Sequence, residues 1–428
     1  MTSHTPACKV GTPNDNCLFV FLYSRLKNKK IQPFMKLQLF ISSILLSSLP
    51  LSAQSALDAV TDSVLAYNTT LKALRAEVTA ANAATRADLS PDDTNVEFGY
   101  LWGGPRSLGE RKDFSVSQSF DMATLTGAKR SWARSRNALT QSRYHARAVE
   151  IVVEARQACI DVIYYNATVR LLETKRQNLE TMSRLVQKET EYGRRDALAL
   201  RAARLELAGI EGELRQSEAE RRGALATLER LCGGHSVTLN DTIFPPVAIP
   251  QRFEELWSIV LANHPTLAAM SAEVREAEQS VKVARQNRLP RLSVGFMGEY
   301  LAGERYQGPT IGLSLPLFGG RRAKQAVAEQ AAAECRRTDA EEQVKGILKE
   351  KYERAEALKD LAAHYDEALS EADAASTLER ALQSGRITMA DFLVANRSLF
   401  ELRQKRLDTM RELHQILTEL WAAQTSIF

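Results

Sequence analysis

The sequence is poor in aromatic residues, and two long stretches of it contain no proline. Phe, Trp and Tyr make up 7% of the 428 residues, while Ala, Leu, Arg, Glu and Gln dominate long tracts. No proline stands between Met122 and Pro245, and none follows Pro316. Because proline breaks helices and this mixture favours them, we expect long helices packed side by side. At 44% apolar and 25% charged residues, the chain is too apolar for a disordered protein.

Motifs of enzymatic chemistry are also missing. The sequence has no HExxH, no Walker loop, no GxSxG and no GxGxxG after a strand. Its six histidines never stand four residues apart, and its five cysteines include no CxxC pair. We therefore expect no catalytic activity, no cofactor and no metal site.

The first 53 residues have the pattern of an N-terminal extension followed by a secretory signal. Lys36 precedes an apolar run over residues 39–51, and small residues around Ala53 offer a cleavage site. Met35 is then the expected start of translation, and the alternative is an uncleaved anchor or a buried helix. Without residues 1–53, the chain holds 50 Lys+Arg and 51 Asp+Glu, a balance that gives no support to a nucleic-acid partner. No cysteine directly follows the apolar run, so lipid attachment is not expected.

One stretch of the sequence occurs twice. Nine of fifteen residues are identical between Val64–Val78 and Val260–Val274, which lie 196 positions apart with no gap. An ungapped match of this length predicts a duplicated unit of nearly two hundred residues. We expect a first repeat over residues 54–250 and a second over residues 251–428.

Each repeat is predicted to contain two helices, a hairpin and a pair of long helices. For the first repeat these are helices 56–67 and 69–89 with a cap at Asn68, hairpin 94–120, and the long pair 122–232, in which helix 122–191 is followed by a return helix ending near 231. A connector over 233–250 follows. For the second repeat they are helices 252–262 and 266–288, hairpin 291–318, and the long pair 321–422, in which helix 321–384 is followed by return helix 389–422.

The hairpins alternate apolar residues with small and polar ones. Val96, Phe98, Tyr100 and Trp102 share one face of the first strand, and Leu292, Val294, Phe296 and Tyr300 share one face of the third; Gln118 interrupts the pattern. Strands of about ten residues with this alternation cross an outer membrane when tilted. Two hairpins cannot close, and lipid tolerates no open sheet edge, so several copies must share one barrel.

The predicted fold class is therefore mainly α with a small β part. Three copies, at four strands per chain, would form a 12-stranded transmembrane β-barrel, from which a long α-helical coiled-coil barrel projects. The alternative is a soluble periplasmic coiled-coil protein with two hairpins and no channel activity.

The sequence resembles the outer-membrane efflux channels of the TolC type. The resemblance rests on the twin units at Leu65-Ala66 and Leu261-Ala262, the strand end Leu313 to Gly320, and the helix tips at Gly193 and Gly385. It covers residues 56–424, and the order and double occurrence of these motifs are more specific than any one of them. The run Thr126 to Arg130 is similar to the heavy-metal efflux branch.

The resemblance implies a homotrimeric channel in the cell outer membrane, with its helical part in the periplasm. Its partners would be a periplasmic adaptor and an inner-membrane pump, as in a tripartite efflux or type I secretion system. The conduit would be passive, because the pump selects the cargo. A metal ion, a drug or a protein would leave nearly the same channel sequence.

The resemblance also assigns roles at the two helix tips. Docking of the adaptor is expected at the first tip on Tyr192, Gly193 and Arg194, and at the second tip on Ser384, Gly385 and Arg386. Cations near a helix C-terminus also favour the helix dipole, which is the alternative reading of the arginines.

Asp391 matches the family's aspartate ring at the periplasmic gate. Val394 and Ala199 stand where further acidic residues would be, so one acidic ring is expected and a double ring is not. The alternative is that Asp391 only caps the return helix.

Overall fold

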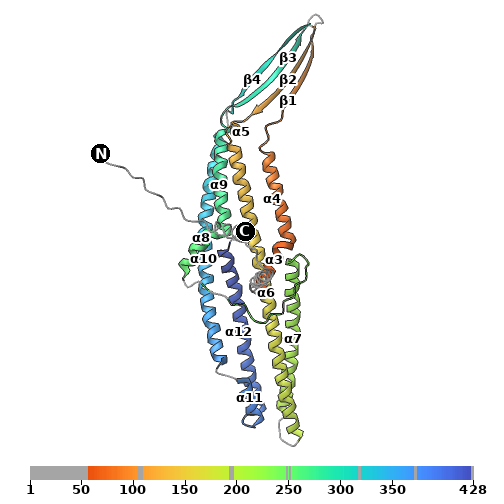
Figure 1. Cartoon of the computed structure of the whole chain (residues 1–428), viewed down its shortest axis with the longest axis vertical. Coiled ribbons are helices and arrows are strands. Elements are labelled where there is room, and N and C mark those ends of the chain that lie inside the picture. Colours follow the sequence, from red (N-terminus) through yellow and green to blue (C-terminus); the bar gives the residue numbers. More distant parts are fainter. Residues whose placement is uncertain are drawn as a thin grey trace, which may run out of the picture. The chain divides into compact units, whose positions relative to one another are not determined.

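The computed structural model describes residues 56–104, 109–191, 197–246, 249, 252–301, 303–316, 320–370 and 374–425 (Figure 1). All of them belong to one compact unit, Ser55–Phe428. The predicted extension and signal over residues 1–53 lie outside the described residues, as do Tyr192, Gly193 and Arg194 of the first tip.

The elements follow the same order twice along the chain. The first series is α3 (Ala56–Tyr67), α4 (Thr69–Ala87), β1 (Asn95–Trp102), β2 (Glu110–Phe120), α5 (Met122–Leu125), α6 (Ala128–Glu191) and α7 (Ala197–Leu231). The second is α8 (Phe253–Asn263), α9 (Pro265–Gln286), β3 (Arg291–Leu301), β4 (Glu304–Ser314), α10 (Gly320–Ser370), α11 (Ala374–Gln383) and α12 (Met389–Gln424). Val64 and Val260, which match in the sequence repeat, are both fully buried. The internal duplication is thus confirmed, while the limits 54–250 and 251–428 stay a prediction.

One of the predicted long helices is interrupted, and part of a second lies outside the described residues. The helix expected over 122–191 breaks after α5, because Gly127 has a φ of 76° and begins a new helix, α6. A left-handed residue cannot continue an α-helix, and glycine adopts it without steric cost. The helix expected over 321–384 consists of α10 and α11, with residues 371–373 between them outside the described part. No described helix has a stretch that is both long and apolar enough to traverse a lipid bilayer.

The four strands form one antiparallel sheet in the order β1-β2-β3-β4. β2 of the first repeat pairs with β3 of the second, so the sheet joins the two repeats (Figure 1). The register places Val96 beside Val116, Val116 beside Phe296, and Phe98 beside Phe114. The opposite face places Glu97 beside Ser115 and Ser117 beside Gly295. The alternation predicted from the sequence therefore becomes one apolar and one polar face.

Gln118, which interrupts the apolar pattern, lies where β2 meets the segment before β1. Its amide oxygen accepts a hydrogen bond from Thr94 (2.6 Å), and its amide nitrogen donates to the Asp92 carbonyl (2.5 Å). The amide is thus satisfied within the protein and requires no contact with water.

Helix α6 is the central packing element of the described helices. It contacts α3, α4, α5, α7, α9 and α12. Its Arg156, only 8% exposed, donates to Thr61 (3.0 Å) and pairs with Asp58 (2.5 Å), both on α3. The same guanidinium lies 3.6 Å from the ring centre of Trp421 on α12. A buried charge is tolerated when it is paired and stacked, so Arg156 ties the first and last helices to α6.

We predict that Gly295→Ala destabilises the sheet, whereas Gly308→Ala in the next strand does not. A Cβ at Gly295 would lie 2.5 Å from the Val116 carbonyl oxygen, and one at Gly308 would meet no atom within 4 Å. Relief of that clash requires a backbone shift between β2 and β3, which costs about 1–3 kcal/mol. The midpoint of denaturation in detergent measures both variants, and equal midpoints would contradict the prediction.

Candidate functional site

The second tip lies between α11 and α12 and is exposed at Ser384, Gly385 and Arg386. Gly385 has a φ of 68°, and its N–H donates to Leu382 (3.0 Å) while that of Arg386 donates to Ala381 (2.9 Å). This pair of bonds is the Schellman motif, in which a left-handed glycine ends the helix. The predicted stop at Gly385 is thus present, and the three predicted docking residues share one exposed turn.

Asp391 lies in the first turn of α12, where it completes a capping box with Thr388. Its carboxylate accepts from the Thr388 backbone N–H (3.1 Å) and hydroxyl (2.7 Å), and the Asp391 N–H donates to the Thr388 hydroxyl (3.2 Å). These hydrogen bonds from Thr388 hold the pKa of Asp391 below its ordinary value. The carboxylate is exposed and therefore carries its charge at neutral pH. Both readings of Asp391 from the sequence, helix cap and exposed negative charge, fit this geometry.

Behind the tip lies a small apolar core. Met389 and Phe392 of α12 are each 1% exposed and belong to a cluster with Leu179 and Met182 of α6 and Ala199 and Ala203 of α7. Val394, at one of the positions compared with an acidic ring, is exposed, whereas Ala199 at the other is buried. The packing fixes where Asp391 emerges from the helix bundle.

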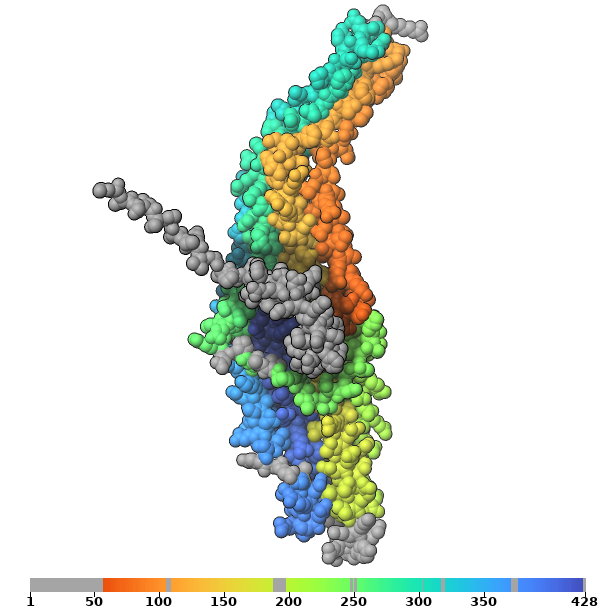
Figure 2. Space-filling model, viewed as in Figure 1, coloured from red at the N-terminus to blue at the C-terminus, as the bar shows by residue number. Residues whose placement is uncertain are grey.

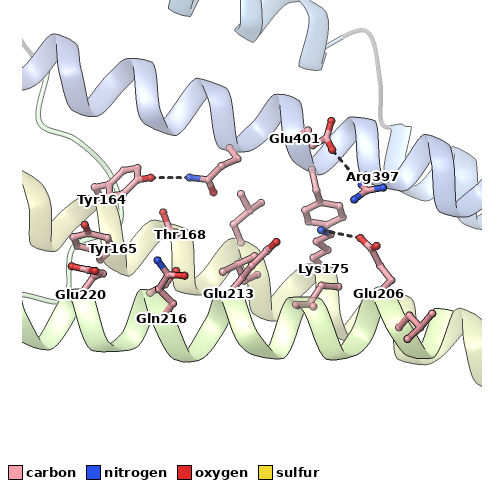
Figure 3. Close-up of a pocket in the computed structure, with 18 of the residues that line it drawn as sticks. Tyr164, Tyr165, Thr168, Lys175, Glu206, Glu213, Gln216, Glu220, Arg397 and Glu401 are labelled. Atoms are coloured by element: carbon pink, nitrogen blue, oxygen red, sulfur yellow. Dashed lines mark hydrogen bonds and ion pairs between the residues drawn. The ribbon is translucent and has the colours of Figure 1, made fainter. Parts of the chain in front are cut away.

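A groove of about 810 Å³ runs between α7 and α12, with α6 as its floor (Figure 3). Tyr164 and Tyr165 of α6 and Phe400 of α12 supply aromatic surface. Lys175 of α6, only 8% exposed, pairs with Glu206 of α7 at 3.3 Å. Across the groove, Arg397 and Glu401 of α12 pair with each other at 3.3 Å.

The α7 wall of this groove is acidic. Glu206, Glu213 and Glu220 stand seven residues apart, and a spacing of seven places side chains on one face of a helix. Glu206 is paired with Lys175, while Glu213 and Glu220 have no ion pair among the described residues. An acidic wall beside aromatic surface suits a helix or peptide that presents basic side chains.

Sequence comparison finds a family whose model matches part of the chain. Residues 256–424, most of the second repeat, match the sequence model of the family described as outer membrane efflux protein. The second repeat is thus similar to this family in sequence. In a comparison with curated proteins, no sequence match was found.

Several solved structures share the fold of this chain. The structure of CusC, which was studied for folding and transmembrane channel formation, is 18% identical with a TM-score of 0.72, and the match covers 87% of this chain and 92% of that one. The Campylobacter jejuni CmeC outer membrane channel is 16% identical with a TM-score of 0.67, over 87% and 86% of the two chains. The Vibrio cholerae outer membrane protein VceC is 17% identical with a TM-score of 0.69, over 86% and 96%. These matches confirm the TolC-type fold predicted from the sequence.

The groove residues were not predicted from the sequence. The acidic spacing on α7 was available as a signal, but Tyr164, Phe400 and Glu401 reach the same groove only after α6 and α12 pack together. Among the described residues, no three His, Cys, Asp or Glu side chains are placed to hold a metal ion.

We predict that Glu206→Gln destabilises the protein more than Glu213→Gln. The first change leaves the buried Lys175 ammonium without its carboxylate, which costs about 2–4 kcal/mol, whereas the exposed Glu213 has no cation to release. Denaturation midpoints in detergent compare the two variants of the same helix face. Recovery of the midpoint in Lys175→Met/Glu206→Gln would show that the lone charge is the cause.

Proposed function

We propose that this chain is the outer-membrane channel of a tripartite efflux or type I secretion system. It would act as a passive conduit from the periplasm and an inner-membrane pump to the exterior. The observation that carries the proposal is a sheet with one apolar and one polar face. Neither face packs extensively against a described helix, and the strands extend beyond the helices (Figure 2). Trp102, Phe98 and Ile311 on its apolar face are 80%, 71% and 78% exposed. In water such an exposed apolar face favours aggregation, whereas in a membrane an apolar face is stable in contact with lipid.

The edges of the sheet support a homotrimer. Among the described strands, β1 and β4 are each paired on one side only. Backbone groups on such edges need partners within a membrane, and β1 of one copy can pair with β4 of the next. Three copies would supply twelve strands and close a pore around the polar face, placing the barrel in the outer membrane and the helices in the periplasm.

The second tip and the groove support docking of a helical adaptor. Ser384, Gly385 and Arg386 are exposed, and the acidic wall at Glu213 and Glu220 offers charge to a basic partner helix. Tyr192, Gly193 and Arg194, which the sequence predicts as docking residues of the first tip, lie outside the described residues and remain part of the proposal.

The proposal predicts trimers and ion conductance. Purified mature protein should have the mass of three copies by native mass spectrometry from detergent, and it should open steady channels in planar bilayers. A periplasmic coiled-coil protein without channel activity would instead be soluble without detergent and silent in bilayers. Monomers that conduct no ions would therefore reject the channel.

We further propose that Asp391 forms one acidic ring at the periplasmic gate, and two variants separate its charge from its cap. Asp391→Asn removes the charge but keeps an oxygen that can accept from Thr388, whereas Thr388→Val removes the cap and keeps the charge. We expect block of the channel by multivalent cations to weaken in Asp391→Asn and to persist in Thr388→Val, because a ring acts through its charge. Block that persists in Asp391→Asn, or that is lost equally in both variants, would reject the ring.

A further inference from the structure

Each repeat bends at an elbow between its two short helices. Asn68 lies between α3 and α4, and His264 lies between α8 and α9, at matching positions 196 residues apart. The two elbows thus provide an internal comparison, because the surrounding sequence is the same duplicated stretch.

The first elbow is locked to the end of α7. Asn68 is 4% exposed, its side-chain oxygen accepts from the Leu71 N–H (2.9 Å), and its amide donates to the carbonyl of Leu231, the last residue of α7 (2.7 Å). The backbone at Gly233 approaches so closely that a Cβ there would lie 2.3 Å from the Tyr67 carbonyl oxygen. Helix cap, hydrogen bond and backbone contact therefore hold this elbow in one position.

The second elbow has none of these side-chain bonds. His264 is the N-cap residue of α9, but its side chain makes no capping hydrogen bond. Its Nδ1 is shielded from solvent and has no hydrogen-bond partner among the described residues. Beside it lies a cavity of about 280 Å³, lined by α6, the elbow itself, and Ala422 and Ala423 near the end of α12. The elbow and the end of the return helix are therefore separated by space where the first repeat has a lock.

The cavity is lined by three carboxylates. Glu150 and Glu154 come from α6, and Glu419 comes from α12. Each has a cationic neighbour, and the pairs are Arg147–Glu150, Arg230–Glu154 and Lys351–Glu419. Gln157 of α6 also lines the cavity and donates to Glu419 (2.9 Å).

Burial lowers the pKa of His264, so the imidazole is neutral at neutral pH. A histidine whose pKa is lower in the folded than in the unfolded state destabilises the fold as the pH falls below the unfolded value, which is about 6.5. This loss of stability is confined to the second elbow, because the charged ring can reach the carboxylates only by leaving its shielded position.

We propose that His264 makes the second elbow a pH-dependent hinge, which moves relative to the end of α12 on acidification while Asn68 keeps the first elbow locked. The protonated ring turns into the cavity toward Glu150, Glu154 and Glu419. α12 begins at Thr388 and Asp391, so the hinge would connect acidity to the gate; this consequence rests on the proposed function, whereas the hinge itself does not.

Hydrogen exchange followed by mass spectrometry tests the hinge on the full-length protein in detergent. Exchange rates at pH 7.5 and 5.0 are corrected for the intrinsic rates, and peptides from α9 and the end of α12 are compared with those from α4 and the end of α7. We expect protection of the second elbow to be lower at pH 5.0 than at pH 7.5, because protonation of His264 disfavours its shielded position. The first elbow should not respond.

Reciprocal exchange of the two residues provides the decisive variants. His264→Asn should abolish the acid response of the second elbow, and Asn68→His should create one at the first. His264→Gln, which cannot be protonated, gives the same test should the asparagine variant fold poorly. An unchanged acid response in His264→Asn or His264→Gln would overturn the proposal.

His414 supplies the matched control, because it is a buried histidine on α12, the helix whose end lines the cavity. It is 4% exposed, stacks on Phe244 at 4.9 Å, and burial lowers its pKa to about 4. His414→Leu should leave the exchange response of the elbow between pH 7.5 and 5.0 intact. If His414→Leu removes the response, the acid sensitivity belongs to the α12 core and the hinge is rejected.

Discussion

The pairing of β2 with β3 is the constraint on which the rest of the structure depends. It joins the two repeats through a continuous ladder from Arg111–Leu301 to Phe120–Leu292. A shift of this ladder by one residue would exchange the faces and bring Ser115 and Ser117 among the apolar side chains. Gly295 permits the close approach to β2, and so a residue without a side chain maintains the register that separates the apolar face from the polar face.

Helix α6 supports the bundle from its centre, whereas the second tip is exposed at its end. Among the described helices α6 contacts six others, and its buried Arg156 binds both ends of the described chain to the bundle through Asp58 and Trp421. The second tip, by contrast, is exposed at Ser384, Gly385 and Arg386, directly beside the buried Met389 and Phe392. A fixed core under an exposed turn is the arrangement that recognition by a partner requires, because the turn is presented without loss of packing.

The two duplicated units follow the same order of helices and strands, but their elbows are held by different contacts. Val64 and Val260 are buried alike, and Asn68 and His264 take the same place in the elbow. The first elbow gains a hydrogen bond to α7 and a backbone contact at Gly233, whereas the second adjoins a cavity. Small polar differences at matching positions thus fasten the first elbow to its neighbouring helix and leave the second without such a bond.

The sequence by itself determined the duplication, the element order, the two-faced hairpins and the glycine stop at Gly385. Each of these follows from local chemistry: a period of two, proline-free tracts, and a left-handed position that glycine fills. Only the tertiary structure decided the break at Gly127, the groove that unites Tyr164, Glu213 and Phe400, and the missing lock at His264. The groove and the missing lock depend on contacts between residues far apart in the chain, and no local pattern encodes which helix a side chain will meet.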